Sequence, residues 1–192
     1  MSEVKELRYG NTGCYCINNK VLIDTDWAGT LAAFFKCIKE NHIELKEIKY
    51  LIITHFHPDH MGIAQEIADL GVQLIVFNEQ KDFIHSSDHV FVKDRSISFR
   101  PIDDKKVRYL SCADSRGLFL EIGIDGEVIH TVGHSDDSIS IILDNGIAIV
   151  GDLYPLHTIS DYHDKRLEES WNSILSHNVK EIHYGHFKEE YL

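Results

Sequence analysis

The sequence predicts a single α/β domain over residues 1–192, and three observations support this. The length is that of one ordinary domain, and 43% of the residues are hydrophobic, which is enough for a buried core. Apolar runs typical of strands alternate along the chain with patterns of helical period. No linker, repeat or low-complexity tract interrupts this alternation, so we expect no domain boundary.

The first half begins with a predicted hairpin. Two short runs, Cys14 to Ile17 and Lys20 to Asp24, flank Asn18-Asn19, a pair that tolerates the positive φ angles of a tight turn. From Gly29 to about Asn41, apolar residues recur at helical spacing with polar residues between them, which predicts an amphipathic helix.

A buried strand, a helix and a second buried strand follow. Tyr50 to Thr54 is a solid apolar run, as expected for a strand buried on both faces. Met61 to Leu70 has a helical pattern that ends at Gly71, a residue suited to a helix C-terminus. Gln73 to Phe77 is the next strand, and the stretch from Lys81 to Asp104 is the least regular part of the chain.

The second half reads as a meander of short strands. Asp125-Gly126 and Asn145-Gly146 are strong turn signals, and a helical pattern covers Leu167 to Leu175. The predicted strands are Leu118 to Gly123, Glu127 to Val132, Ile139 to Leu143, Ile147 to Val150 and, after the helix, Lys180 to Tyr184.

Metal-capable side chains gather where the first buried strand ends. His55, His57, Asp59 and His60 lie within six residues, in the pattern His-x-His-x-Asp-His. In extended chain, residues two apart project to the same side, so His55 and His57 can bind one ion. Asp59 and His60 lie around the turn and can face a neighbouring ion. Pro58 stiffens the turn at the start of a helix, where no N–H donor is needed.

Three more such residues follow predicted strands. His134, Asp152 and His186 each come after a strand and next to a glycine, which lets backbone approach closely. Sites in α/β proteins are built at the carboxyl ends of strands. We therefore expect these three side chains to belong to the same site as the first four.

The amino-acid composition limits the kinds of molecule that this protein is expected to bind. Lys and Arg total 19 against 31 Asp and Glu, for a formal net charge of −12, and 13 residues are histidine. Such an acidic surface disfavours nucleic acid and anionic membranes, so we expect a small-molecule substrate. We also expect a cytoplasmic protein with reduced cysteines, because no apolar stretch fits a membrane helix or signal peptide and no CxxC pair occurs. Nothing in the sequence indicates an oligomeric state.

These residues, in this order, resemble the metallo-β-lactamase superfamily, and the chain looks like a small single-domain metallo-hydrolase of it. The resemblance implies the αββα sandwich, in which two mixed sheets are flanked by helices. It implies that His55, His57 and His134 bind one metal, that Asp59, His60 and His186 bind a second, and that Asp152 bridges them. Asp24 matches a position that supports the site without binding metal. By ligand type, two zinc ions are favoured, with iron or manganese as alternatives.

The function implied is hydrolysis of a small ester, thioester, lactone or phosphodiester by a metal-bridging hydroxide. Asp59 would orient the hydroxide or shuttle its proton. Tyr154 and His157, just beyond Asp152, are candidates to protonate a leaving group or bind an oxyanion, although an aromatic residue after a strand is also a common core residue. Two alternatives stay open: a mononuclear-iron oxidoreductase of the persulfide dioxygenase type, and a non-catalytic metal-binding domain of the same fold.

Overall fold

The computed structural model describes residues 2–93 and 97–192. Met1 and residues 94–96, which belong to the irregular stretch noted above, lie outside the described residues. The chain divides into two compact units. Residues 3–110 form the N-terminal unit, and residues 111–192 with Ser2 form the C-terminal unit. The single domain expected from the sequence stays a prediction.

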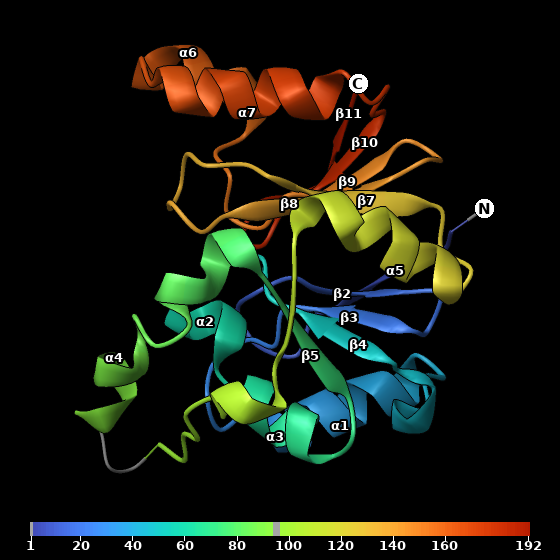
Figure 1. Ribbon diagram of the computed structural model, residues 1–192, viewed down its shortest axis with the longest axis vertical. Helices are drawn as coiled ribbons and strands as arrows, with labels where there is room; N and C mark the ends of the chain where they lie inside the picture. The colour runs from blue at the N-terminus through green and yellow to red at the C-terminus, as the bar shows by residue number, and fades with distance from the viewer. Residues whose placement is uncertain (1, 94–96) are drawn as a thin grey trace. The chain divides into compact units, whose positions relative to one another are not determined.

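The N-terminal unit is built on a six-stranded sheet in the order β1-β2-β3-β4-β5-β6 (Figure 1). Antiparallel pairing joins the first three strands, and parallel pairing joins β3 to β6. The strands are β1 (Val4–Leu7), β2 (Cys14–Ile17), β3 (Val21–Ile23), β4 (Tyr50–Ile52), β5 (Gln73–Phe77) and β6 (Arg108–Leu110).

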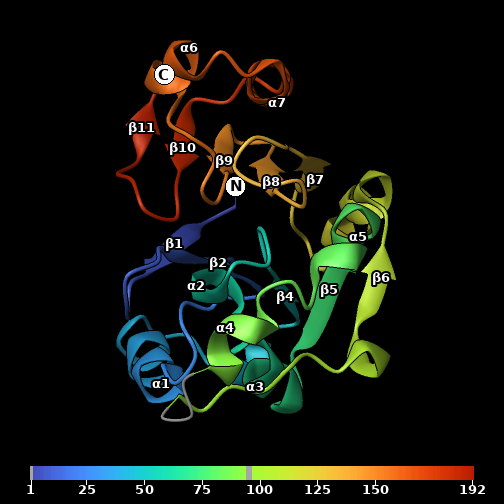
Figure 2. The same cartoon turned by 90° about the vertical axis from the view of Figure 1, so that its left-hand side faces the viewer.

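Helices α1 and α3 lie side by side on one face of this sheet (Figures 1 and 2). Phe34 and Ile38 of α1 and Ile67 of α3 are buried in a core with Leu51 and Leu74 of the strands. Burial of such large side chains contributes about 1.5–3 kcal/mol each. The helices are α1 (Leu31–Glu40), α2 (Pro58–Met61), α3 (Ala64–Asp69) and α4 (Asp88–Val92), with short 3₁₀ helices at Leu45–Glu47, Asn78–Phe83 and Asp104–Lys106.

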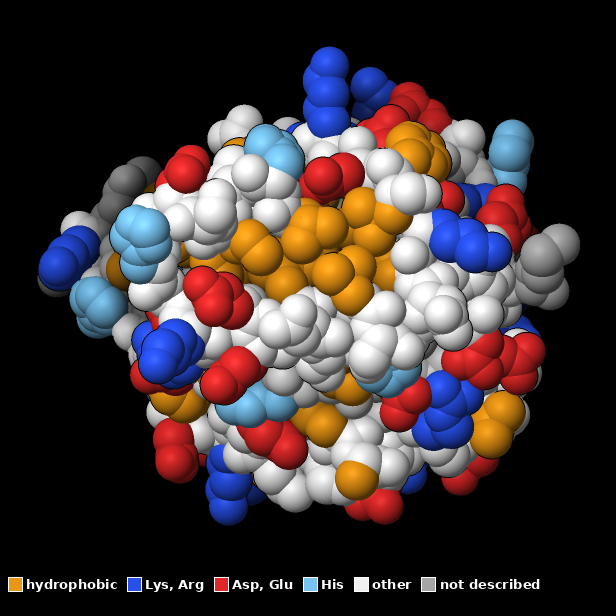
Figure 3. Space-filling view, turned by 90° about the horizontal axis from the view of Figure 1, so that it is seen from above, with side chains coloured by type: hydrophobic (Ala, Val, Ile, Leu, Met, Phe, Trp, Pro, Cys, Tyr) orange, Lys and Arg blue, Asp and Glu red, His pale blue; other side chains and the backbone are white. Residues whose placement is uncertain are grey.

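The C-terminal unit has a five-stranded mixed sheet in the order β11-β10-β9-β8-β7, in which only β9 and β10 are parallel. Leu167, Trp171 and Ile174 of α7 are buried against it. Hydrophobic side chains also gather on the outer face over α6 and α7 (Figure 3). The elements are α5 (Ser115–Glu121), β7 (Gly126–His130), β8 (Ile139–Leu143), β9 (Ile147–Ile149), α6 (Ile159–Tyr162), α7 (Lys165–Leu175), β10 (Glu181–His183) and β11 (Glu190–Tyr191), with 3₁₀ helices at Cys112–Asp114 and Leu156–Thr158.

Most predicted elements are confirmed, and one is wrong. The strand expected over Leu118 to Gly123 is instead part of helix α5. Ser115, Leu118 and Phe119 are buried, whereas Leu120 is 55% exposed. These buried positions follow the i, i+3, i+4 spacing of a helix. The continuous apolar run suits a strand as well, so the sequence pattern did not reveal the helix. Asp125-Gly126 consequently joins a helix to a strand and is not a hairpin turn.

The helix predicted over Met61 to Leu70 also differs. It starts earlier, at Pro58, and is interrupted between α2 and α3 at Gly62 and Ile63. A Cβ at Gly62 would lie 2.1 Å from the backbone nitrogen of Ala28. The two backbones therefore approach too closely for a side chain at this position. In the described part of the chain, no helix is long and apolar enough to span a bilayer.

Candidate metal centre

The His-x-His-x-Asp-His motif occupies the turn between β4 and α2 in the N-terminal unit. His57 has extended backbone (φ −78°, ψ 154°) and precedes Pro58, the first residue of α2. The loop before the helix holds His55, which lies in a bend, and His57, and the first helical turn holds Asp59 and His60. His55 and His60 are buried, whereas the Asp59 side chain is 30% exposed.

The rings of the motif lie close together. The Nε2 atom of His55 is 3.1 Å from Nδ1 of His57, and the ring centroids of His55 and His60 are 4.1 Å apart. The Nε2 atom of His60 lies 3.9 Å from a carboxylate oxygen of Asp59. The turn thus brings all four predicted residues of this unit together.

Asp24 sets the protonation of two of these rings. Its buried carboxylate lies 2.8 Å from Nδ1 of His60, and because a carboxylate only accepts, Nδ1 carries the proton. The same carboxylate accepts the hydroxyl proton of Thr54 at 2.8 Å. The Thr54 oxygen then accepts from Nδ1 of His55, at 3.2 Å. Both histidines are left with an Nε2 lone pair, the form that binds metal.

Side chains from elsewhere in the N-terminal unit hold the backbone of this turn. The Gln80 amide donates to the carbonyl of Ile53 at 2.9 Å, and the Ser87 hydroxyl donates to that of Phe56 at 2.6 Å. The Thr12 hydroxyl donates to the carbonyl of Asp59 at 2.7 Å. Sequence reasoning missed Thr12, Thr54, Gln80 and Ser87, because isolated polar residues give no spacing signal.

Cys14 lies buried in the same unit, with its thiol 3.7 Å from the hydroxyl of Tyr9. Burial, and next the negative charge of Asp24, hold the pKa of Cys14 well above its usual value. The thiol is therefore protonated at neutral pH, and only a thiolate is a good metal ligand or nucleophile. Cys14 is a structural residue.

The C-terminal unit carries the other three predicted ligands at strand ends. His134 follows β7, Asp152 follows β9 and His186 follows β10. One oxygen of Asp152, Oδ2, lies 3.4 Å from Nε2 of His186 and 3.7 Å from Nε2 of His134. The Asp152 side chain is only 11% exposed. A single carboxylate oxygen that faces two imidazole nitrogens suits the predicted bridging role.

Glycines hold two of these strand ends together. The N–H of Gly185 donates to the carbonyl of Gly151 at 2.7 Å, immediately before the two ligand positions Asp152 and His186. Gly151 has a positive φ of 58°. The backbone of the two strand ends is therefore joined directly beside these ligand positions, and the predicted role of the glycines stays a prediction.

Tyr154 and His157 lie in different surroundings. The Tyr154 ring packs edge-on against His134, with centroids 6.0 Å apart, and stacks on Tyr162 at 4.1 Å. His157 is 71% exposed, and its Nδ1 lies 3.7 Å from a carboxylate oxygen of Glu190. Tyr154 therefore lies beside a predicted ligand. His157 lines a pocket of the C-terminal unit together with Pro155 and Glu190.

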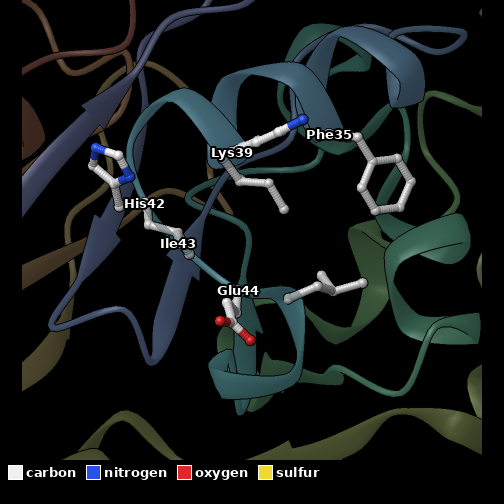
Figure 4. A pocket seen from close by; sticks show the side chains of 7 residues that line it. Phe35, Lys39, His42, Ile43 and Glu44 are labelled. Carbon is white, nitrogen blue, oxygen red and sulfur yellow. The ribbon is translucent and has the colours of Figure 1, made fainter.

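One pocket of the N-terminal unit lies away from these residues. It has a volume of about 610 Å³ and is formed where α1 meets the following loop (Figure 4). Phe35, Ile43 and Leu45 give it an apolar lining, with Lys39 and Glu44 at its rim. None of the predicted metal ligands lines it.

The donor atoms of the two units fit divalent metal ions. Imidazole and carboxylate groups are ligands that zinc, iron and manganese accept. Two imidazole nitrogens 3.1 Å apart, as in His55 and His57, require a proton or a cation between them. Asp24 fixes the tautomers that leave His55 and His60 as lone-pair donors.

The chain belongs to the metallo-beta-lactamase superfamily. The family model matches residues 14–185. This range includes six of the seven predicted ligand positions, and the seventh, His186, lies one residue beyond it. This confirms the resemblance inferred from the sequence motifs.

Solved structures with the same fold include proteins of several descriptions. The Thermotoga maritima protein tm0894 has a TM-score of 0.72 and 19% identity, over 100% of this chain and 99% of its own. The B3 metallo-beta-lactamase BLEG-1 has a TM-score of 0.70 and 20% identity, over 98% of this chain and 94% of its own. TTHA1623, solved in a di-iron-bound form, has a TM-score of 0.68 and 17% identity, over 100% and 90%. The predicted fold class, with two mixed sheets and flanking helices, is confirmed.

Proposed function

We propose that this chain is a dinuclear zinc hydrolase of a small ester, thioester, lactone or phosphodiester. In this proposal His55, His57 and His134 hold one ion, and Asp59, His60 and His186 hold the other. Asp152 lies between the ions. The proposal joins residues of both units, and family membership supports that joining.

The observation that carries the proposal is the fixed protonation of the histidines. Asp24 and Thr54 leave His55 and His60 with an Nε2 lone pair each. A solvated polar turn would not need a buried carboxylate to select tautomers. Metal sites use such hydrogen-bonded carboxylates to orient their ligands.

Bound divalent ions would lower the pKa of a coordinated water and polarise a carbonyl or phosphoryl group. The chain's own residues then supply the proton transfers. In this proposal the Asp59 side chain, which is partly exposed and whose backbone carbonyl accepts from Thr12, takes a proton from the attacking water. The Tyr154 hydroxyl, whose ring packs against His134, donates to the developing oxyanion.

Metal reconstitution with a substrate panel tests the proposal. Metal-free protein is loaded with Zn²⁺ or Fe²⁺ and assayed with 4-nitrophenyl acetate, a thioester, a lactone, bis(4-nitrophenyl) phosphate and a chromogenic β-lactam. We expect the zinc form to hydrolyse at least one of them. We expect Asp59→Asn to lower kcat by about 100-fold or more, since general base catalysis contributes on this order. Asp82→Asn, at an exposed position of the same unit, is the control and should have no effect.

Two outcomes favour the alternatives. Oxygen consumption on a persulfide by the iron form alone would indicate an oxidoreductase. The di-iron form of TTHA1623 is a reason to include this arm. Metal binding with no turnover in either form would indicate a non-catalytic domain.

A further inference from the structure

A second pocket, in the C-terminal unit, is lined by residues that closely follow two candidate ligands in the chain. It has a volume of about 270 Å³, close to the lower end of the range for small-ligand sites. Its lining comes from two segments, one beginning at Pro155 and the other including Phe187. These positions come three residues after Asp152 and one residue after His186.

The connection between pocket and ligands is built into the backbone. The N–H of Gly185 donates to the carbonyl of Gly151 at 2.7 Å. The segments that carry Asp152 and His186 therefore begin next to each other. Both segments then continue into the lining of the pocket, so the lining begins within a few residues of these two ligand positions.

Glu190 is the partly buried acidic residue of this pocket, which Glu189, Lys188 and His157 also line. Its side chain is 25% exposed, and its Oε2 accepts the hydroxyl proton of Tyr184 at 2.8 Å. Its other oxygen, Oε1, lies 3.7 Å from Nδ1 of His157, which is beyond hydrogen-bonding distance. Burial and the hydrogen bond to Glu190 raise the pKa of Tyr184, so the phenol stays a donor. Oε1 keeps its capacity to accept a hydrogen bond from a ligand.

Aromatic rings form the walls around this carboxylate. The rings of Tyr184 and Phe187 meet edge-on with centroids 5.9 Å apart, and Phe187 is 45% exposed. Pro155 adds a further apolar surface. Aromatic faces attract cations as well as apolar groups.

We propose that this pocket binds a protonated amine on the substrate, through the Glu190 carboxylate and the exposed ring of Phe187. The inference rests on the proposed hydrolase function, because it assigns the substrate class of that site: a small hydrolysable compound with an ammonium-bearing arm. The N–H donors of an ammonium match the acceptor Oε1, and its charge matches the carboxylate. The short aliphatic stem suits the apolar walls.

Binding of n-butylammonium to the metal-loaded protein tests the pocket without requiring turnover. We expect saturable shifts of the Tyr184 and Phe187 amide signals in ¹H–¹⁵N NMR spectra. Glu190→Gln keeps the size of the side chain and an acceptor for Tyr184, so it should fold. It should nevertheless weaken n-butylammonium binding by about tenfold or more, as expected when a charge-assisted hydrogen bond is lost.

Matched controls separate charge from shape. Glu169→Gln, at an exposed position of α7 outside the pocket lining, should change the dissociation constant of n-butylammonium less than twofold. Binding of 1-butanol, a neutral ligand of similar shape, should be equally weak in wild-type protein and in Glu190→Gln. Equal affinity of both proteins for n-butylammonium, or shifts that do not saturate, would overturn the proposal.

A pair of esters links the pocket to the reaction. For 4-nitrophenyl 6-aminohexanoate, Glu190→Gln should lower kcat/KM by about tenfold, whereas for 4-nitrophenyl hexanoate it should have no effect. Saturable ammonium binding with no hydrolysis of either ester would contradict the hydrolase function and leave the pocket assignment standing. Hydrolysis of both esters with equal kcat/KM in the two proteins would contradict the pocket assignment alone.

Discussion

At the scale of single residues, Asp24 organises the N-terminal half of the candidate centre. Its carboxylate accepts from the backbone N–H of Thr54 at 2.7 Å, from the Thr54 hydroxyl and from His60. The residue has a left-handed backbone (φ 61°), which Asp tolerates better than most side chains. Its position one residue after β3 places it beside the end of β4.

Two substitutions at Asp24 separate folding from metal binding. Asp24→Ala leaves several buried donors without an acceptor, so we expect the free energy of unfolding to fall by about 3 kcal/mol. Asp24→Asn keeps an acceptor for Thr54 and tolerates the same φ, so the loss should be nearer 1 kcal/mol, again on the order of one hydrogen bond. Because the amide no longer fixes His60 as Asp24 does, metal affinity should fall by about 10–100-fold in both variants. Urea unfolding and competitive zinc titration give the two quantities, and unchanged affinity in Asp24→Asn would contradict the role assigned to Asp24.

The sequence predicted the ligand candidates better than their supports. Histidine and aspartate at the spacing His55-x-His57-x-Asp59-His60 are rare enough to be noticed in one chain. Gln80 and Ser87 bond the same turn, but their role depends on which carbonyls lack partners in the folded chain. That information is three-dimensional, and single polar residues do not reveal it.

At the scale of elements, the predictions that held have a clear local pattern. Asn18 and Asn19 adopt positive φ angles of 50° and 58° in the turn between β2 and β3, as the Asn-Asn pair indicated. Helix α5 was mistaken for a strand because Leu118, Phe119 and Leu120 form a continuous apolar run, which suits either element.

Replacing either of two glycines by alanine should change the stability of the protein, in opposite directions at the two positions. A Cβ at Gly62 would meet the backbone of Trp27 and Ala28 at 2.1–2.3 Å, so Gly62→Ala should destabilise the protein by about 3 kcal/mol or more. Gly117 lies in α5, where an added methyl group would meet no neighbouring atom within 4 Å, so Gly117→Ala should stabilise the protein by about 0.5–1 kcal/mol. Thermal or urea unfolding of both variants checks this. A neutral Gly62→Ala would contradict the close backbone approach at this position.

His85 joins two parts of the irregular stretch that follows β5. Its ring nitrogens lie 2.8 Å from Asp88 of α4 and 3.2 Å from Asp104. Burial lowers the pKa of His85, but the hydrogen bonds to both carboxylates outweigh this effect and raise it above the usual 6.5. Because the pKa is raised in the folded state, the protonated His85 ring stabilises the segment fully below about pH 6.5. This stabilisation is lost as the pH rises through the raised pKa of the folded state.

Hydrogen exchange of the α4 amides tests this pH dependence. After correction for intrinsic rates, protection should decrease above about pH 6.5 in the wild-type protein. In His85→Gln the protection should be lower and should not change with pH over the same range. His89→Gln, at another histidine in the same stretch, should behave like the wild-type protein. A wild-type profile that is flat across this range would rule out His85 as the titrating group.

At the scale of the whole molecule, the acidic composition and the histidine content have different meanings. Five of the 13 histidines and two of the 31 acidic residues are assigned to metal binding. The formal net charge of −12 counts all 31 acidic residues against 19 basic ones, and two divalent ions would reduce its magnitude to 8, since −12 + 4 = −8. The expectation that the partner is a small molecule rests on this charge and stays a prediction.

The central proposal is that the seven predicted ligand residues hold two metal ions per chain. The most direct measurement is the zinc content of reconstituted protein, determined by elemental mass spectrometry after removal of weakly bound metal. We expect about two zinc ions per wild-type chain and about one or fewer in both His55→Ala and His134→Ala, which remove ligands from different units. Wild-type protein without bound metal, or two ions retained in both variants, would contradict the claim.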